Sequence, residues 1–394
     1  MSSLDFVRPG YKNNGITVQV ICCEDQKFLM YFRRSINIFF QKASVQCLLF
    51  LFLSFAAGNA EERTYQNRLT RIQNPKPLLA DFPKWVEPIR ETNRFEGPIL
   101  VYDKDADLSV RAWRYSYKAH GIIEMPNRLR AKNTAVILVH PWGIDDGQGW
   151  KTPEPAGVCD FCTPQKNHLA GKHTRKVINP FLKSVRKKVG LVAYSMPGNE
   201  TSIHKKLYRS FRGKPTNTER QEGAKELKQK LTRFLYQGET LPVLLQISRD
   251  KPVVDYFNQF KGLDAVRFNP KGFWELPIPV ASDVEVDPDD IVIYDGEGYP
   301  ALKQNLDAHG IRHVLLLGYA TDICYAHTCA GFENLTRDFN VFLVGDATLS
   351  SFPASDTPRL NTSAHICSAS LDHLITQLSW IRFDSAGDRR PSRK

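Results

Sequence analysis

The sequence predicts an α/β fold in which a mostly parallel β-sheet lies between two layers of helices. Six apolar runs of strand length alternate with longer amphipathic stretches, and each run is too continuously apolar to leave one face in water. Such alternation is typical of a doubly wound βαβ series. The predicted strands are 135–140, 190–196, 242–248, 290–295, 313–319 and 341–346. We therefore expect a three-layer α/β/α domain with a six-stranded sheet.

The composition is that of a folded protein and excludes several classes. Of the 394 residues, 42% are hydrophobic and 24% are charged, which argues against a disordered, collagen-like or low-complexity chain. The formal charge of +11 is spread along the chain without long basic blocks, so it indicates solvation and no nucleic-acid partner. The sequence has no G-x-G-x-x-G, P-loop or G-x-S-x-G motif, so nucleotide binding and a serine nucleophile have no support.

Residues 1–60 read as an N-terminal leader and signal segment. The run 45–57 is apolar, follows a basic start, and precedes the small residues Gly58 and Ala60. This run is shorter than the roughly 20 residues that span a bilayer, which favours a cleaved signal over an uncleaved anchor, although both interpretations stay open. We expect the signal to end near Ala60 and the protein to be exported to the periplasm or the extracellular space.

The remaining chain divides into three parts. Residues 61–130 combine a proline-containing extended arm with several short strands, and we expect them to form a small β extension. Residues 131–381 hold the βαβ series, in which the stretches 179–188 and 299–310 predict helices, the second ending at a glycine. Residues 382–394 are expected to be a disordered tail.

Residues that can carry chemistry follow several predicted strands. His140 follows the first strand, Asp295 the fourth and Asp346 the sixth, while Cys324 comes soon after the fifth. Ligands of such sheets bind beyond the carboxyl ends of the strands. Cys324 is expected in the first turn of a helix, whose N–H groups can stabilise a thiolate or an oxyanion. The alternative is that Cys324 is a small buried hydrophobe, a common role of cysteine.

The stretch 290–347 resembles the isochorismatase-like cysteine hydrolase superfamily. That family has a strand ending in G-x-x-T-x-x-C and a later valine-rich strand ending in Asp-Ala. The residues that match are Gly318, Thr321, Cys324, Asp346 and Ala347. The resemblance implies a hydrolase that acts on amides, imides or vinyl ethers of small molecules, with Cys324 as nucleophile and a cis peptide bond before Thr321. It requires no cofactor, and relatives often assemble as homo-oligomers.

The family's two partners of the cysteine are replaced in this chain. His140 stands where the family has Asp, and Asp295 stands where it has Lys, with Tyr294 the neighbour if the register shifts by one. In one interpretation Cys324 is the nucleophile, His140 is the general base and Asp295 orients the imidazole. In the other, the site has lost its chemistry and the protein binds a small ligand or a protein partner without turnover.

The long loop after His140 is a candidate binding loop. It has few apolar residues, and a loop of this length inside a compact domain is usually functional or disordered. Trp142 could form a wall of a pocket, and Asp145 could direct a carboxylate into it or replace the family's acid. With Tyr294 and Thr321, these are the predicted binding residues for a small-molecule substrate.

Four potential metal ligands lie in the same loop at the spacing C-x2-C-x5-H-x4-H: Cys159, Cys162, His168 and His173. Such a set could hold a structural zinc ion and fold a loop that has no core of its own. The alternative is a disulfide between Cys159 and Cys162 in an exported protein. If Cys329 also paired with Cys367, Cys324 would be the odd thiol.

Overall fold

The computed structural model describes residues 63–141, 164–233, 244, 246–258, 276–353, 355–372 and 377–384. Residues Tyr65–Lys394 form a compact unit of their own. No helix within the described ranges is both long enough and apolar enough to cross a bilayer. Several sequence predictions fall outside the described residues: the leader and signal segment, Trp142, Asp145, Cys159, Cys162 and the last ten residues of the tail.

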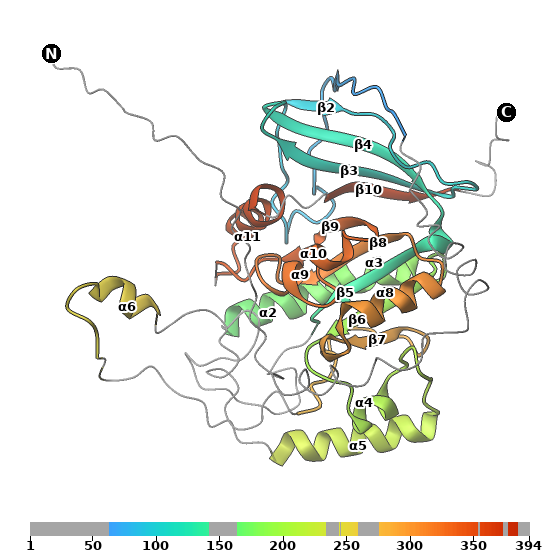
Figure 1. The fold of residues 1–394 in the computed structure, drawn as a ribbon, viewed down its shortest axis with the longest axis vertical. Helices are drawn as coiled ribbons and strands as arrows, with labels where there is room; N and C mark the ends of the chain where they lie inside the picture. The colour runs from blue at the N-terminus through green and yellow to red at the C-terminus, as the bar shows by residue number, and fades with distance from the viewer. Residues whose placement is uncertain are drawn as a thin grey trace, which may run out of the picture. The chain divides into compact units, whose positions relative to one another are not determined.

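One ten-stranded sheet runs through the compact unit in the order β1-β2-β4-β3-β10-β9-β8-β5-β6-β7 (Figure 1). Its strands are β1 (Thr70–Arg71), β2 (Arg94–Glu96), β3 (Leu108–Ser116), β4 (Gly121–Leu129), β5 (Thr134–Val139), β6 (Leu191–Met196), β7 (Ile291–Tyr294), β8 (His313–Tyr319), β9 (Asn340–Leu349) and β10 (Gln377–Phe383). Strands β9, β8, β5, β6 and β7 are parallel, as the continuous apolar runs predict.

Five of the six predicted strands are present as β5 to β9. The run 242–248 is the exception, because its described residues, Leu244 and 246–248, are not in a strand. The prediction of a strand there was wrong: Leu244 is 89% exposed, so apolar composition in this run does not reflect burial in the sheet.

The β extension is continuous with the main sheet. The predicted six-stranded sheet with a separate extension is therefore corrected to one sheet, which has ten strands within the described residues. The connecting strand is β10, which the sequence analysis did not identify. It pairs antiparallel with β3 on one side and parallel with β9 at Gln377↔Leu343 on the other. The pairing with β3 covers what would otherwise be an open sheet edge, and unpaired edges are a liability for any sheet.

Helices cover both faces of the parallel strands. The α-helices of the described residues are α2 (Pro164–His173), α3 (Asn179–Val185), α4 (Ser202–Leu207), α5 (Asn217–Arg233), α6 (Pro252–Asn258), α8 (Gly298–Ala308), α9 (Cys324–His327), α10 (Phe332–Leu335) and α11 (Pro358–Ile366). Of these, α6 is largely exposed and does not pack on the sheet (Figure 1). Helix α3 confirms the prediction for 179–188, although it ends three residues earlier. Helix α8 is followed by Gly310 at φ +67, the left-handed geometry that favours glycine after a helix.

Two apolar clusters identify the two faces of the sheet. Face 1 carries Leu138, Tyr194 and Val292 and packs against residues of α3, α4 and α5. Face 2 carries the alternate strand residues, such as Val139 and Ile293, and packs against residues of α8, α9 and α10. Successive strand residues point to opposite faces, so these clusters assign a face to each side chain. The three-layer arrangement predicted from the sequence is confirmed.

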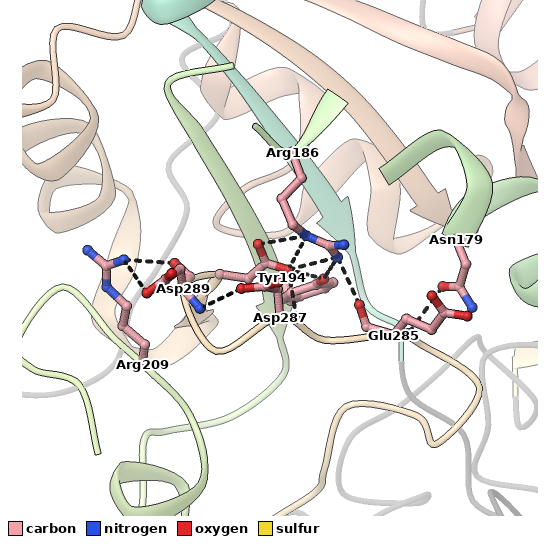
Figure 2. A network of polar contacts seen from close by, with 8 residues as sticks. Asn179, Arg186, Tyr194, Arg209, Glu285, Asp287 and Asp289 are labelled. Atoms are coloured by element: carbon pink, nitrogen blue, oxygen red, sulfur yellow. Dashed lines mark hydrogen bonds and ion pairs between the residues drawn. The ribbon is translucent and has the colours of Figure 1, made fainter. Parts of the chain in front are cut away.

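A polar network on face 1 holds the segment before β7 against β6 and the end of α3 (Figure 2). The Asp290 carboxylate accepts hydrogen bonds from Arg186 Nε at 3.0 and 3.1 Å and from the Tyr194 hydroxyl at 2.6 Å. Arg186 Nη2 also donates to the Glu285 carbonyl at 2.8 Å. Asp290 and Tyr194 are both buried, and each polar atom named here has a partner.

Candidate functional site

His140 lies directly after β5, at the carboxyl end of the parallel strands. Its backbone has φ +46, which is uncommon for a residue other than glycine and occurs often at functional sites. The His140 N–H donates to the Ser195 carbonyl of β6 at 2.8 Å, so the residue is still tied to the neighbouring strand. Its side chain is almost fully buried.

Asp295 begins the short helical turn after β7 and meets His140. Its Oδ2 lies 2.8 Å from His140 Nε2, and its Oδ1 accepts a hydrogen bond from the Cys329 N–H at 3.2 Å. A carboxylate oxygen accepts and does not donate, so Nε2 carries the proton of the neutral imidazole. Nδ1 is then the basic nitrogen, and no described residue gives it a hydrogen-bond partner. The structure therefore brings together two of the three predicted catalytic residues.

Cys324 is the first residue of α9, as the sequence predicts, but this helix is only four residues long. Its partly buried side chain packs on face 2 against the cluster that contains Val139 and Ile293. Val139 directly precedes His140, and Ile293 lies two residues before Asp295. Cys324 thus packs on the face that carries Val139 and Ile293, the strand residues that precede His140 and Asp295 in the chain.

Gly318 near the end of β8 allows the strands to approach closely there. Its φ is +114, and a Cβ atom on it would lie 2.2 Å from the Val139 carbonyl oxygen. Any side chain at this position would therefore push β8 away from β5. The glycine of the predicted motif keeps the strand that leads to Cys324 next to the strand that leads to His140.

The cis peptide bond expected before Thr321 is present one bond further upstream, between Tyr319 and Ala320. Thr321 itself is fully buried, and its hydroxyl lies 3.3 Å from both Thr348 Oγ1 and His365 Nδ1. Its backbone N–H donates to the Leu349 carbonyl. Thr321 therefore fixes the turn before Cys324 through contacts within the protein, and its role as a ligand-binding residue stays a prediction.

Tyr294 and Ser195 carry buried hydroxyls at the carboxyl ends of β7 and β6. Within the described residues neither hydroxyl has a hydrogen-bond partner. Tyr294 belongs to face 1, where its ring stacks on His204 with centroids 4.7 Å apart, so it lies on the opposite side of the sheet from Cys324. We call His140 Nδ1, Ser195 Oγ and the Tyr294 hydroxyl the three orphan atoms, because the described part of the chain supplies no partner for them.

Lys166 of α2 is a buried charged residue that the sequence analysis missed. Its ammonium group donates to the Pro353 carbonyl at 2.9 Å and to Asn361 Oδ1. Burial lowers the pKa of Lys166 to about 8, and the charge of Asp322 opposes this shift. Asp322 accepts from the Ser351 N–H at 2.7 Å. Lys166 and Asp322 thus both bind the loop 351–353 after β9. The strand pattern of the sequence does not predict such a contact.

Lys303 lies on the surface of α8. Its ammonium group is 2.5 Å from Asp307 and 3.7 Å from Asp338. These ion pairs are solvent-exposed and lie on the helix surface. The structure therefore gives Lys303 no place beside His140 or Asp295.

His173 does not behave as an available metal ligand. It is fully buried, its Nδ1 lies 2.9 Å from the Tyr319 hydroxyl, and its Nε2 lies 2.7 Å from the Asp346 carbonyl. Burial lowers its pKa to about 4. Both ring nitrogens are thus engaged by the protein, whereas His168 is exposed. Across the described ranges no three His, Cys, Asp or Glu side chains gather as a metal site.

The three cysteines in the described ranges are not joined by disulfides. A Cys329–Cys367 bridge is therefore absent, and this part of the cysteine pairing considered from the sequence is wrong. Cys367 is exposed on the segment after α11, whereas Cys329 is half-buried beside Asp295. Burial and the nearby Asp295 charge raise the pKa of Cys329 to about 12, so it stays a thiol at neutral pH.

The structure thus brings His140 and Asp295 into contact at the carboxyl ends of β5 and β7, while Cys324 packs on face 2 at the start of α9. His140 and Asp295 could be found from the sequence because each follows an apolar run. Ser195 was missed, although the signal was visible: it is the polar residue at the end of the predicted strand 190–196. Asp346, which the sequence did single out, lies under α2 with burial raising its carboxyl pKa to about 7.

Comparison with known proteins supports a family relationship over the last part of the chain. Residues 254–373 match the family described as the isochorismatase domain. A search of curated proteins gives no significant match.

Solved structures similar to this chain include hydrolases of that family. A cysteine hydrolase from Pseudomonas syringae pv. phaseolicola is 15% identical, with 64% of this chain and 91% of that chain covered and a TM-score of 0.31. A pyrazinamidase of Pyrococcus horikoshii in complex with zinc is 17% identical, with 60% and 96% covered and a TM-score of 0.29. A pyrazinamidase/nicotinamidase from Streptococcus mutans is 14% identical, with 62% and 99% covered and a TM-score of 0.28.

Proposed function

We propose that this chain is a divergent cysteine hydrolase of the isochorismatase-like superfamily, with Cys324 as nucleophile, His140 as general base and Asp295 as the group that orients the imidazole. The match of residues 254–373 to the isochorismatase domain supports this proposal. The substrate class is a small-molecule amide or imide, in which a C–N bond is cleaved. His140 stands at the position of the family's Asp, and Asp295 stands at the position of its Lys. The general base of the proposed reaction is therefore an imidazole in place of a carboxylate.

The observation that carries this proposal is the contact between His140 Nε2 and Asp295 Oδ2 at 2.8 Å. It leaves Nδ1 as a buried basic nitrogen for which the described residues offer no hydrogen-bond donor. A histidine held in one tautomer by a carboxylate is the arrangement that activates serine and cysteine nucleophiles in unrelated hydrolases. A purely structural histidine would be expected to have both nitrogens hydrogen-bonded, as His173 does.

The proposed reaction has two balanced steps. First, His140 Nδ1 takes the Cys324 thiol proton, the sulfur attacks the substrate carbonyl carbon, and a C–S bond forms while the C–N bond breaks; the imidazolium returns its proton to the departing nitrogen. Second, His140 takes a proton from water, and the hydroxide attacks the thioester carbon. A C–O bond forms as the C–S bond breaks, and the imidazolium returns its proton to the departing sulfur. A carboxylic acid is released and the thiol is restored.

The remaining sequence predictions stay proposals. We propose that the chain is exported with a signal segment that ends near Ala60 and that it forms homo-oligomers. The set Cys159, Cys162, His168 and His173 stays the candidate for a structural zinc ion, with a Cys159–Cys162 disulfide as the alternative. A ligand-binding protein without turnover is the competing function. It predicts the opposite result in the experiment below.

The test is the pH dependence of Cys324 alkylation by iodoacetamide, with peptide mass mapping to separate it from other thiols. We expect a midpoint well below the unperturbed value of about 8.5, because a neighbouring imidazolium stabilises the thiolate. His140→Ala should return the midpoint to that of an ordinary thiol. Asp295→Asn should lower the alkylation rate at neutral pH by about 100-fold, because the amide donates to Nε2 and reverses the tautomer.

The matched control is His309→Ala, an exposed histidine at the end of α8 that should leave the alkylation profile unchanged. A wild-type Cys324 that titrates like a free thiol would contradict the proposal and favour the ligand-binding function. The same holds if His140→Ala alkylates with the wild-type pH profile.

A further inference from the structure

We infer that Ser195 forms the floor of the substrate site and donates a hydrogen bond from its hydroxyl to the substrate carbonyl oxygen. This inference rests on the proposed function. The ligand class is an uncharged acyl compound, an amide or imide, whose carbonyl oxygen becomes negatively charged as the sulfur attacks.

The first argument is the position of Ser195 in the sheet. Ser195 pairs in register with Val139 of β5 and Ile293 of β7. Both partners belong to face 2, so alternation places the Ser195 side chain on the same face as they are. His140 follows Val139 by one residue and Asp295 follows Ile293 by two. Ser195 therefore lies at the carboxyl end of β6 between the strands that lead to His140 and Asp295, on the face against which Cys324 packs.

The second argument is the energetic cost of the hydroxyl. Ser195 is 1% exposed, and its Oγ is one of the three orphan atoms. A buried hydroxyl without a partner destabilises a fold by about 1–3 kcal/mol. The position two residues earlier on the same face is Ala193, which is equally buried and needs no partner. An alanine at position 195 would avoid this loss of stability. The serine is therefore explained if its hydroxyl binds a group other than the described residues.

The third argument is that Ser195 and His140 offer complementary chemistry on neighbouring strands. His140 Nδ1 accepts a proton in the proposed reaction, and the Ser195 hydroxyl can donate a hydrogen bond. The His140 N–H to Ser195 carbonyl bond fixes the two backbones relative to one another. No covalent bond to Ser195 forms or breaks, and its proton stays on the oxygen. The hydrogen bond strengthens as negative charge develops on the carbonyl oxygen, which is how such donors lower reaction barriers.

Two reagents separate this role from a role in forming the thiolate. Iodoacetamide is attacked at a saturated carbon and develops no oxyanion, whereas p-nitrophenyl acetate acylates the same sulfur through an oxyanion and releases p-nitrophenolate. For Ser195→Ala we expect acylation of Cys324 to slow by about 10- to 100-fold. Loss of one oxyanion donor typically lowers the rate by about 100-fold or more, so this expectation lies at the lower end of that effect. Alkylation by iodoacetamide should stay within about twofold of wild type at every pH.

The matched control is Ser109→Ala in β3. Ser109 is buried, and its hydroxyl accepts a hydrogen bond from Arg128, far along the chain from Cys324. This variant should lose stability and keep the acylation rate, whereas Ser195→Ala should keep or gain stability and lose the acylation rate. Ser195→Thr, which retains the hydroxyl, should recover part of the acylation rate.

Two results would overturn the inference. One is an acylation rate in Ser195→Ala equal to wild type; the other is an equal loss of acylation and alkylation, which would mean that the serine acts on the thiolate. A wild-type protein that Cys324 reagents do not modify would instead refute the proposed function. The two failures are thus distinguishable.

Discussion

Two polar regions on strands β6 and β7 differ in how completely their groups are paired. In the network around Asp290, Arg186 and Tyr194 both point at one buried carboxylate, and each polar atom named there is hydrogen-bonded (Figure 2). At the carboxyl ends of the same strands lie the orphan atoms of Ser195 and Tyr294, for which the described residues provide no partner. Tyr194 and Ser195 are consecutive residues, so the contrast arises within one strand.

The difference separates a network that stabilises the fold from two buried hydroxyls, one on each face of the sheet, for which the described residues provide no compensation. A buried polar group that is fully paired holds the fold together, whereas one without a partner costs stability and needs another explanation. Polar groups exposed to a substrate must be left unpaired by the protein itself. Two tests at these regions and a third at Asp346 of β9 check this comparison. They follow in order of decreasing expected effect.

Removal of the carboxylate at the centre of the paired network should have the largest effect. Asp290→Ala leaves the Arg186 guanidinium and the Tyr194 hydroxyl without their shared acceptor, and breaking a buried pair in this way costs about 3–5 kcal/mol. Urea denaturation measures the loss. The control is Asp289→Ala, whose carboxylate is exposed and pairs with Lys214, and whose loss should be much smaller because water screens an exposed ion pair. Equal losses in the two variants would refute the assignment of this network to stability.

The same chemical change at two tyrosines tests the contrast directly. Tyr194→Phe removes a hydrogen bond to a carboxylate and should cost about 1.5–3 kcal/mol of unfolding free energy. Tyr294→Phe removes a hydroxyl with no partner among the described residues, so it should change stability by less than about 0.5 kcal/mol or increase it. Both rings are buried, so packing changes little in either variant. A large loss in Tyr294→Phe would mean that its hydroxyl is paired after all.

Asp346 extends the comparison to β9 and gives the smallest expected effect. Its Oδ1 has no partner among the described residues, and burial, with a lesser contribution from Asp81, raises its pKa to about 7. The folded state therefore binds this proton more tightly than the unfolded chain, whose pKa is about 3.9. The contribution of Asp346 to the free energy of unfolding is greatest below about pH 4, and it is lost as the pH rises towards 7.

Asp346→Asn should consequently be more stable than wild type by about 1–2 kcal/mol at pH 7.5, with the difference shrinking towards pH 4. Urea denaturation of both proteins at each pH gives the difference. His173, which contacts the Asp346 carbonyl, has a lowered pKa and loses its contribution as the pH falls from 6.5 to 4, but it is present in both proteins. A variant less stable than wild type at pH 7.5 would show that the carboxylate is paired in the fold.

The parallel strands could be predicted from the sequence because burial on both faces demands continuous apolar runs. The same rule failed at 242–248, where the apolar residue Leu244 is exposed, because composition does not report what covers a segment. Strand β10 was missed since its place depends on pairing with β3, more than 250 residues away in the chain. Likewise, the spacing of His173 from the other potential ligands is close to that of a zinc site. In the fold, its two ring nitrogens are instead hydrogen-bonded to the Tyr319 hydroxyl and the Asp346 carbonyl.

By itself the sequence determined the strand and helix periods, the motif that places Cys324 after β8, and the residues that follow β5 and β7. These are local properties, set by side-chain hydrophobicity and by the turn residues of each segment. Only the tertiary structure decided that Asp295 meets His140 Nε2, that Nδ1 is therefore the basic nitrogen, and that Ser195 lies in register between Val139 and Ile293. Hydrogen-bond partners are set by the register of strands distant in sequence, which no local pattern encodes.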